Sequence, residues 1–335
     1  MPARTREVRE RLLGACRRHL DPAARIDELA PLSAGASAET WRFDLALGNR
    51  VRPLVAQLFA GQTQFAAALD KRTQGRVQDA AHRAGVATPR VEFILDEADG
   101  LGEGFVSAFQ AGETLGQRIV RDAALADARR NMTGQCAALL AKIHGMATED
   151  LPPLPAERPG AMVDQLFATH ERYATRLPVF DVAFRHLRDN LPPDSDSPRL
   201  VHGDFRNGNF IVDAGGIVCV LDWEAAHLGD PMEDLAWLCL NAWRYGRIEL
   251  PVGGFGRRAA LYTAYERETG KAVDAARVRF WEVFGTLKWG VICQWFAHQF
   301  MSGEVRKLER AAIGRRVAEV ELDLLDLIEG VEPCR

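Results

Sequence analysis

The chain has 335 residues, of which 47% are hydrophobic and 26% are charged, and its formal net charge is -4. This length allows two or three compact units with apolar cores of their own, and the slightly acidic balance gives no electrostatic reason to expect nucleic-acid binding. The six cysteines form no CxxC pair, so no zinc site or disulfide framework is expected; without an apolar leader or an apolar run of about 18 residues, we expect a cytoplasmic protein with no membrane contacts.

The first third of the chain has the pattern of one helix followed by a small antiparallel sheet. Apolar residues at helical spacing predict an amphipathic helix over 5–20. β-type runs begin at Ile26, and the turn signal Gly48-Asn49 separates the alternating run 40–45 from the run 54–59. Further along, the expected elements are a helix over 65–84 and strands over 91–95 and 104–109.

The rest of the chain is dominated by helical periodicity, with a single β-hairpin inserted. Helices are expected over 121–147, 161–190, 230–245, 256–270, 275–301 and 303–329. The hairpin is predicted from two β-type runs, 210–213 and 217–221, joined by a Gly-rich turn. Together the patterns predict an α+β fold with two lobes. Residues 1–110 form a small, five-stranded antiparallel lobe, and residues 111–335 form a larger, mainly helical lobe.

The segment around the hairpin, 200–224, holds most of the polar residues that can do chemistry. If the two strands pair about the turn, Asn209 lies roughly opposite Asp222, and opposed residues in an antiparallel pair have Cβ atoms about 4.5 to 5.5 Å apart. An amide oxygen and a carboxylate, without sulfur or imidazole, form a hard-oxygen set suited to Mg²⁺ with phosphate oxygens as further ligands. The pair therefore predicts a Mg²⁺ site for a nucleoside triphosphate, to which Glu224 can add a second carboxylate.

Three residues of the loop before the hairpin are candidates for catalysis. Asp204 lies five residues before Asn209, where its carboxylate can point into the same space and accept a proton from an attacking hydroxyl. His202 is expected to order the loop through hydrogen bonds. Arg206 can neutralise charge on a transferred phosphoryl group. The sequence thus favours phosphoryl transfer to a hydroxyl group with Asp204 as the base.

This segment, His202-Gly-Asp-Phe-Arg-Asn-Gly-Asn209 followed by Asp222-Trp-Glu224, resembles the catalytic and metal-binding loops of the aminoglycoside phosphotransferase and choline kinase family. Three weaker landmarks are similar to the same family: 32–37, 111–116 and 229–236. The resemblance covers most of the chain after the first predicted helix. It implies a protein-kinase-like two-lobed fold, a small-molecule kinase activity with an alcohol group as acceptor, and the use of ATP, or GTP in its place, with Mg²⁺.

The resemblance also places a nucleotide site in the N-terminal lobe. It implies that the loop covering the phosphates consists of Ser33, Ala34, Gly35, Ala36 and Ser37. Members of the family usually carry Lys or Arg on the third strand and a partner Glu on the next helix, and here Gln57 and Gln74 stand at those positions. Two amides can share a hydrogen bond but supply no positive charge to phosphates. The alternatives for that charge are Lys71, Arg72 and Arg76 on the following helix.

Two patterns in the second half of the chain favour structural explanations over functional ones. Asp230, Pro231 and Glu233 have the spacing of a helix start. Six of the seven tryptophans follow the catalytic loop, which allows an aromatic cage for a quaternary ammonium group such as choline. Trp281 and Trp289, however, recur at helix-like spacing among other apolar residues, so we expect them to lie in the core.

Three functions stay open on the sequence. The leading one is a phosphotransferase for a small hydroxyl compound, whose acceptor can be an aminoglycoside, choline or ethanolamine, a sugar, homoserine or an acyl-linked hydroxyl compound. The second is a pseudokinase that binds a nucleotide or another ligand without transferring phosphate, and it is favoured by Gln57 and Gln74. The third is a metal-dependent hydrolase using His202, Asp204 and Asp222, which leaves the predicted N-terminal sheet without a role.

Overall fold

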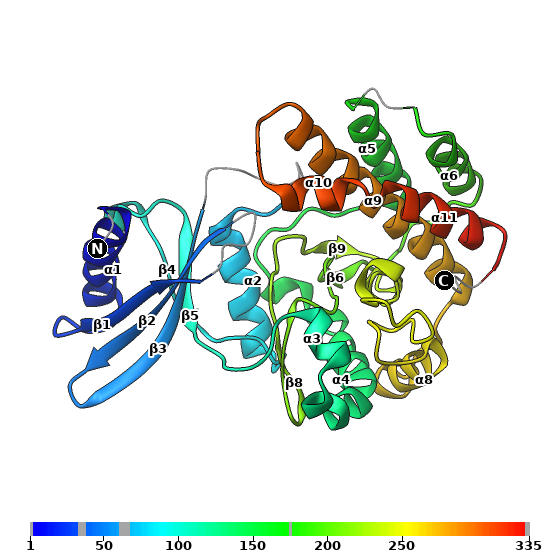
Figure 1. Cartoon of the computed structure of the whole chain (residues 1–335). Coiled ribbons are helices and arrows are strands. Elements are labelled where there is room, and N and C mark those ends of the chain that lie inside the picture. Colours follow the sequence, from blue (N-terminus) through cyan, green and yellow to red (C-terminus); the bar gives the residue numbers. More distant parts are fainter. Residues whose placement is uncertain (1–2, 33–37, 60–67, 174–175, 332–335) are drawn as a thin grey trace.

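The computed structural model describes residues 3–32, 38–59, 68–173 and 176–331. Within these ranges the chain forms a small lobe built on a five-stranded sheet and a larger, mainly helical lobe (Figure 1). The α+β class expected from the sequence is confirmed. We infer that the lobes divide near residue 110, directly after the last strand of the sheet. No described helix is both long and apolar enough to cross a membrane.

The sheet of the small lobe is antiparallel and has the strand order β1-β2-β3-β5-β4. Its elements, with the first helix, are α1 (Ala3–His19), β1 (Arg25–Pro31), β2 (Ala38–Leu47), β3 (Arg50–Phe59), β4 (Val91–Ile94) and β5 (Gly104–Ala108). Because side chains alternate along a strand, Trp41, Phe43 and Leu45 of β2 share one buried face. Val8 and Leu12 of α1 pack in the same apolar cluster, so α1 covers this face.

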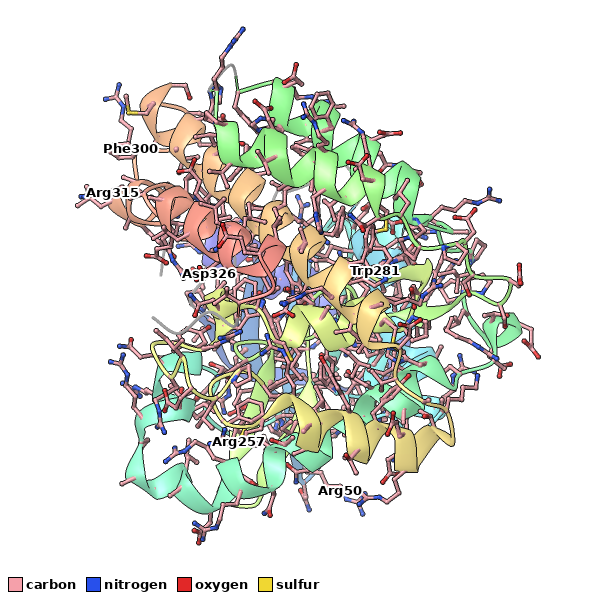
Figure 2. The ribbon with its side chains drawn as sticks, turned by 90° about the vertical axis from the view of Figure 1, so that its right-hand side faces the viewer. Arg50, Arg257, Trp281, Phe300, Arg315 and Asp326 are labelled. Atoms are coloured by element: carbon pink, nitrogen blue, oxygen red, sulfur yellow. The ribbon has the colours of Figure 1, made fainter. Side chains whose placement is uncertain are left out.

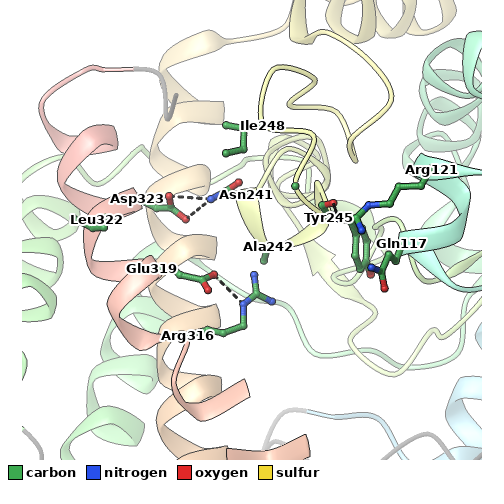
Figure 3. A pocket seen from close by; sticks show the side chains of 11 residues that line it. Gln117, Arg121, Asn241, Ala242, Tyr245, Ile248, Arg316, Glu319, Leu322 and Asp323 are labelled. Atoms are coloured by element: carbon green, nitrogen blue, oxygen red, sulfur yellow. Dashed lines mark hydrogen bonds and ion pairs between the residues drawn. The ribbon is translucent and has the colours of Figure 1, made fainter. Parts of the chain in front are cut away.

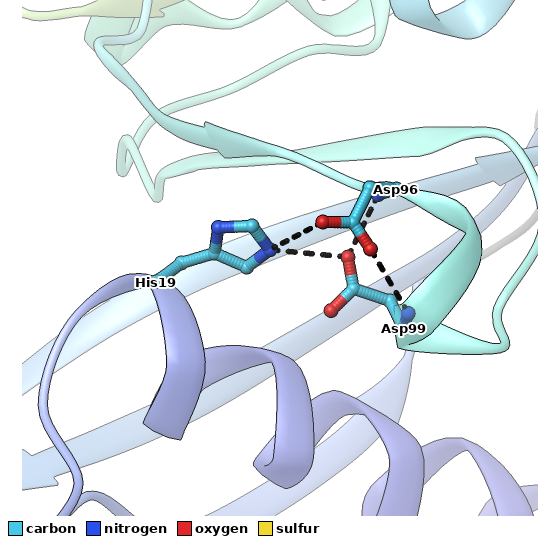
Figure 4. Close-up of side chains that lie close together, drawn as sticks. All are labelled: His19, Asp96 and Asp99. Atoms are coloured by element: carbon cyan, nitrogen blue, oxygen red, sulfur yellow. Dashed lines mark hydrogen bonds and ion pairs between the residues drawn. The ribbon is translucent and has the colours of Figure 1, made fainter.

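A cluster of charged side chains fastens the end of α1 to the turn before β5 (Figure 4). The carboxylate of Asp99 is fully buried, contacts Arg18, and lies 3.1 Å from His19 Nε2. Asp99 Oδ2 also accepts a hydrogen bond from the backbone N–H of Asp96 at 2.8 Å. His19, Asp96 and Asp99 offer metal-type ligand atoms within 4.8 Å of one another. The Arg18 guanidinium already lies against both carboxylates, however, so the cluster is an ion-pair network that holds α1 in place.

Helix α2 (Lys71–Arg83) lies between the sheet and the helical lobe (Figure 1). Gly75 lets this helix approach the sheet closely, because a Cβ atom there would lie 3.0 Å from the side chain of Phe105 on β5. Its apolar residues Val77 and Ala80 nevertheless belong to the core of the helical lobe and not to the cluster beneath α1. Helix α2 is therefore part of the small lobe by chain order and part of the large lobe by packing.

The large lobe begins with a segment that pairs with the hairpin, since Glu113 N–H donates to Val212 O at 2.8 Å and Val212 N–H donates to Glu113 O at 2.9 Å. Its helices are α3 (Gly116–Arg121), α4 (Ala126–His144), α5 (Pro159–Glu171), α6 (Pro178–Asp189), α7 (Met232–Leu238), α8 (Arg258–Thr269), α9 (Ala275–Met301), α10 (Leu308–Gly314) and α11 (Val317–Ile328). Its strands are β6 (Arg199–Val201), β7 (Phe210–Asp213), β8 (Gly216–Val220) and β9 (His227–Gly229). Short 3-10 turns are η1 (Glu97–Asp99), η2 (Ala123–Leu125), η3 (Thr148–Asp150) and η4 (Asn241–Trp243).

Helix α9 is the central element of this lobe, and Figure 2 shows it with Trp281 near its start and Phe300 near its end. Its span coincides with the predicted helix 275–301. Trp281 is 2% exposed, which confirms it as a core residue. The predicted helix 161–190 is instead two helices, since Pro178 starts α6 in the first turn, where a missing N–H is tolerated. The predicted helix 303–329 is likewise divided, into α10 and α11.

Candidate active site

The loop between β6 and β7 holds the carboxylate of Asp204 in a fixed orientation. Its Oδ1 accepts hydrogen bonds from Trp237 Nε1 at 2.7 Å and from Arg206 Nε at 2.9 Å. Its Oδ2 accepts a hydrogen bond from Asn209 Nδ2 at 2.6 Å. Three donors thus order the two carboxylate oxygens, and because Asp204 is only half-buried, solvent still reaches the group. Such ordering is what a base needs in order to align an attacking hydroxyl.

A second aspartate, Asp234 near the start of α7, holds the backbone of the catalytic loop by hydrogen bonds. Its carboxylate accepts the backbone N–H groups of His202 at 2.8 Å and Gly203 at 2.9 Å. It also lies 3.0 Å from His144 Nε2. Burial works to raise the pKa of Asp234, but the hydrogen bond and charge of His144 outweigh it, so that pKa lies below its ordinary value. Asp234 is therefore a charged, fully buried anchor for the loop backbone.

The sequence interpretation missed this role of Asp234 and treated the surrounding segment as a helix start. Part of that interpretation holds, because Asp230 Oδ1 accepts the backbone N–H of Met232 at 3.0 Å. The signal that could have revealed the anchor is the second aspartate of Gly229-Asp-Pro-Met-Glu-Asp-Leu-Ala236, which follows Asp230 by one helical turn. Asp230 lies just before α7 and contacts its first residue, whereas Asp234 lies within the helix and binds the loop.

His202 links the catalytic loop to the hairpin and is completely buried. Its Nδ1 accepts the backbone N–H of Asp204 at 3.3 Å, which leaves Nε2 to donate to Leu221 O at 3.1 Å. Burial lowers the pKa of His202, in agreement with a neutral ring between one donor and one acceptor. The structure therefore places His202 as the orienting residue that its loop position suggested, and not as a residue facing the reaction centre.

The hairpin brings Asn209, Asp222 and Glu224 toward one space, though with a pairing shifted by one residue from the predicted one. Phe210 pairs with Val220, and Leu221 N–H donates to Asn209 O at 2.8 Å. Val212 pairs with Ile217 but Ile211 pairs with Cys219, so β8 carries one extra residue as a bulge, and Asn209 comes opposite Leu221. Asp222 then adopts φ of 68°, a left-handed conformation that is unusual for a residue other than glycine. This turn redirects the chain immediately after the strand.

The electrostatics of this space fit a bound cation. Burial, followed by the charges of Glu224 and Asp204, raises the pKa of Asp222 to about 7. Glu224 Oε2 is buried without a hydrogen-bond partner among the described residues. Asn209 uses its amide nitrogen on Asp204, which leaves its amide oxygen for a metal. Crowded carboxylates, an orphaned carboxylate oxygen and an amide oxygen form the all-oxygen donor set that Mg²⁺ prefers.

The predicted nucleotide residues of the small lobe are placed only in part. Residues 33–37, expected to cover the phosphates, lie outside the described part of the chain. Gln57 lies on β3, where it pairs with Phe105 of β5. Gln74 is buried on α2, donates from Nε2 to Leu69 O at 2.6 Å, and accepts from Lys71 Nζ at 2.8 Å. Both polar ends of the Gln74 amide are therefore engaged within the α2 segment, and no hydrogen bond joins it to Gln57 in the described structure.

Two adjoining pockets open beside the catalytic loop. The larger, about 490 Å³, lies between α3, η4 and α11 and is shown in Figure 3. The smaller, about 360 Å³, reaches Arg206 and Gly208 of the loop itself. Gln117 and Tyr245 line both pockets, so the two are neighbouring compartments. A small molecule in this region can reach the loop that carries Asp204.

Three tryptophans beneath these pockets form a cluster whose faces are already covered by cations. Trp243 packs against both Trp237 and Trp289, with ring centroids 5.5 and 5.0 Å apart. The covering cations are Arg206 at 4.4 Å from the Trp243 ring, Lys288 at 4.9 Å from Trp237 and Arg316 at 5.6 Å from Trp289. Because side chains of the protein occupy these ring faces, the cluster is not an open cage for a quaternary ammonium ligand.

Several acidic residues of the large lobe are engaged in contacts within the protein. Glu233 lies 3.1 Å from His227 Nε2, and Glu282 contacts Arg258. Glu266 accepts the backbone N–H of Val273 at 2.8 Å. Like Asp234, these three residues therefore have partners within the fold.

A two-lobed α+β fold that holds an aspartate loop beside an Asn, Asp and Glu donor set defines a kinase-like phosphotransferase. Residues 28–281 match the model of the phosphotransferase enzyme family, and the chain belongs to this family. The match confirms the resemblance seen in the catalytic loop and the expected class of activity.

Solved structures with the same fold have low sequence identity to this chain. A Ralstonia eutropha protein described as a candidate aminoglycoside phosphotransferase superposes with a TM-score of 0.76 at 18% identity, covering 96% of this chain and 98% of that one. A choline/ethanolamine kinase family protein from Mesorhizobium loti gives 0.63 at 20% identity, covering 98% and 99%. The aminoglycoside phosphotransferase APH(4)-Ia, in complex with ADP and hygromycin B, gives 0.61 at 16% identity, covering 96% and 98%.

A curated relative is a much longer protein. Acyl-CoA dehydrogenase family member 11 of Gallus gallus is 30% identical over 171 residues, which are 48% of this chain and 22% of that protein. The chain thus matches a minor part of that relative's length, and the match says nothing of the relative's remaining sequence.

Proposed function

We propose that this kinase transfers the γ-phosphate of ATP to a hydroxyl group of a small molecule, with Asp204 as the base. The observation that carries the proposal is the Asp204 carboxylate, which Trp237, Arg206 and Asn209 hold by hydrogen bonds of 2.6 to 2.9 Å. The same asparagine that orders the base also belongs to the predicted metal set. A hydroxyl aligned by Asp204 would therefore lie next to the phosphate that the metal set binds.

Asn209, Asp222 and Glu224 would hold Mg²⁺, which when bound neutralises the charge of the phosphates. Arg206 stacks on Trp243 and contacts Asp204, so its guanidinium is fixed beside the base. From that position it supports the negative charge that develops on the transferred group. The buried, neutral His202 keeps the loop and the hairpin together and moves no proton in this scheme.

The acceptor is proposed to be a hydroxyl compound without a fixed positive charge. The smaller pocket is lined by Arg118 and Arg206, and the larger one by Arg121 and Arg316. In the larger pocket Glu319 pairs with Arg316 at 3.0 Å and Asp323 accepts hydrogen bonds from Asn241 at 3.1 Å, so both carboxylates have partners within the protein. Arginines of this kind hydrogen-bond well to carboxylates, phosphates and neutral oxygen-rich groups.

A pseudokinase is the second candidate, because neither Gln57 nor Gln74 supplies positive charge to phosphates. Calorimetry with MgATP tests the two, using the intact chain and Asp222→Ala, with Asp181→Ala on the exposed face of α6 as the control. Phosphate transfer to a panel of hydroxyl compounds is followed in the same samples. We expect magnesium-dependent binding that is lost in Asp222→Ala alone, and transfer to at least one compound.

Two other results would decide against the kinase scheme. Binding without transfer to any compound of the panel would favour the pseudokinase. An absence of MgATP binding at millimolar concentration would contradict the nucleotide site itself.

A further inference from the structure

Lys71, the first residue of α2, is a buried ammonium group with few partners. Its exposed fraction is 3%, although lysine is among the residues that are almost never fully buried unless paired. Its Nζ donates to the neutral amide oxygen of Gln74 at 2.8 Å and lies 3.9 Å from Glu224 Oε2. An ammonium group has three N–H donors, so this set leaves it incompletely satisfied. Glu224 Oε2, which accepts no hydrogen bond among the described residues, is the oxygen that forms this long ion pair with Lys71.

The position of Lys71 is fixed relative to the metal set. The backbone N–H of Leu69 donates to Glu224 O at 2.8 Å, which ties the start of α2 to the segment after the hairpin. Asp70 caps the helix by accepting the backbone N–H of Thr73 at 2.8 Å. Because the apolar side of α2 also packs in the core of the helical lobe, Lys71 is held beside Asp222 and Glu224.

Resting on the kinase function proposed above, we infer that Lys71 binds the phosphates of the nucleotide and supplies the positive charge that Gln57 and Gln74 lack. Without nucleotide, the ammonium group offsets the carboxylates of Asp222 and Glu224. When a metal ion satisfies those carboxylates, the ammonium group is freed to donate to the phosphate oxygens that share the ion. The cation of the phosphate site has thus moved from the third strand to the start of the following helix.

A purely structural lysine predicts a different result from a phosphate-binding one. Were Lys71 needed only to stabilise the fold by neutralising carboxylates, its loss would weaken the binding of adenosine and of MgATP alike. A lysine that binds phosphate strengthens the binding of ATP but not of adenosine, because adenosine has no phosphate. The arginine variant keeps the positive charge, whereas the methionine variant keeps only the length and apolar stem of the side chain.

The experiment is calorimetry of MgATP and of adenosine with the full chain and with Lys71→Met, Lys71→Arg and Arg83→Met. Arg83 is an exposed cation in the last turn of the same helix and serves as the matched control. We expect Lys71→Met to weaken MgATP binding on the order of 10- to 100-fold, as for the loss of a charged hydrogen bond, with adenosine affinity unchanged. Lys71→Arg should retain most of the affinity, and Arg83→Met should bind as the unaltered chain does.

Two outcomes overturn the inference while leaving the kinase function standing. One is MgATP affinity of Lys71→Met within twofold of the unaltered chain, when Asp222→Ala has lost binding. The other is an equal loss for adenosine and MgATP, which would show a structural effect. A failure of the unaltered chain to bind MgATP would instead remove the function on which the inference depends.

Discussion

Trp237 donates from its indole nitrogen to Asp204 Oδ1 at 2.7 Å, from a helix that lies beyond the hairpin in the chain. The tryptophan is 4% exposed and packs against Trp243, so its ring cannot follow a moving loop. The Asp204 carboxylate is therefore oriented by the rigid core of the helical lobe as well as by its own loop. A hydrogen bond of this kind keeps one carboxylate oxygen occupied and directs the other toward Asn209.

Trp237→Phe tests this orientation, because it removes the donor and keeps most of the apolar contact. We expect the rate of phosphate transfer to fall about tenfold, as for the loss of one hydrogen bond to a charged group, and MgATP affinity to stay within twofold. Trp289→Phe is the control, since Trp289 Nε1 lies in the same cluster without a partner among the described residues. Equal losses in the two variants would show that packing, and not the bond to Asp204, sets the rate.

Asp234→Asn should destabilise the whole helical lobe. The carboxamide keeps one acceptor oxygen, but its nitrogen cannot accept either loop N–H, so a buried donor of His202 or Gly203 loses its partner. The expected loss in free energy of unfolding is about 2 to 4 kcal/mol, measured by urea denaturation. The exposed Asp181→Asn should change it by less than about 0.5 kcal/mol. A loss for Asp234→Asn no larger than that of the control would disprove the anchoring role.

Asp204 and Trp237 also show where the sequence was informative and where it was not. The closeness of Asp204 and Asn209 was predictable because the two residues lie five positions apart in one loop. The donors that orient Asp204 from elsewhere were not predictable, since a tryptophan in a buried helix has the same pattern whether its nitrogen bonds Asp204 or has no partner. Trp237 and Trp289 differ only in what the fold brings to them.

The fold was predictable where apolar residues recur at regular spacing, and less so where a bulge interrupts the pairing of two strands. Helix α9 matched its predicted span because its apolar residues recur without a proline or glycine turn. The hairpin was found but its register was not, since the bulge in β8 leaves no local signal and changes which residue lies opposite Asn209. The packing of α2 against the helical lobe depends on contacts between distant segments, which no single stretch of sequence specifies.

Asp323 on α11 should make stability depend on pH between about 4 and 6. Burial raises the pKa of Asp323 to about 6 from 3.8, despite two hydrogen bonds from Asn241 Nδ2 at 3.1 Å (Figure 3). The folded state therefore binds the proton more tightly than the unfolded state does. The resulting stabilisation is complete below pH 3.8 and is lost as pH rises through about 6.

Asp323→Asn removes this titration and should be more stable than the unaltered chain at pH 7.5, by about 3 kcal/mol at most. At pH 5 the advantage should be roughly half as large, because the carboxyl of the unaltered chain is then largely protonated. Urea denaturation at the two pH values measures the difference in free energy of unfolding, with Glu171→Gln at an exposed position as the control. An advantage that is absent at pH 7.5, or equal at both pH values, would contradict the assigned cause.

The charge of the acceptor can be read from a panel of matched hydroxyl compounds. We expect kcat/KM for a hydroxy acid or a neutral polyol to exceed that for choline or an aminoglycoside by at least tenfold, because Arg206 and Arg316 cover the aromatic faces and line the pockets. Arg316→Met should narrow this difference and leave MgATP affinity unchanged, whereas Arg130→Met on the exposed side of α4 should do neither. Preferred transfer to choline or an aminoglycoside would show that the cations over the tryptophans move aside for the substrate, and would refute the proposed acceptor class.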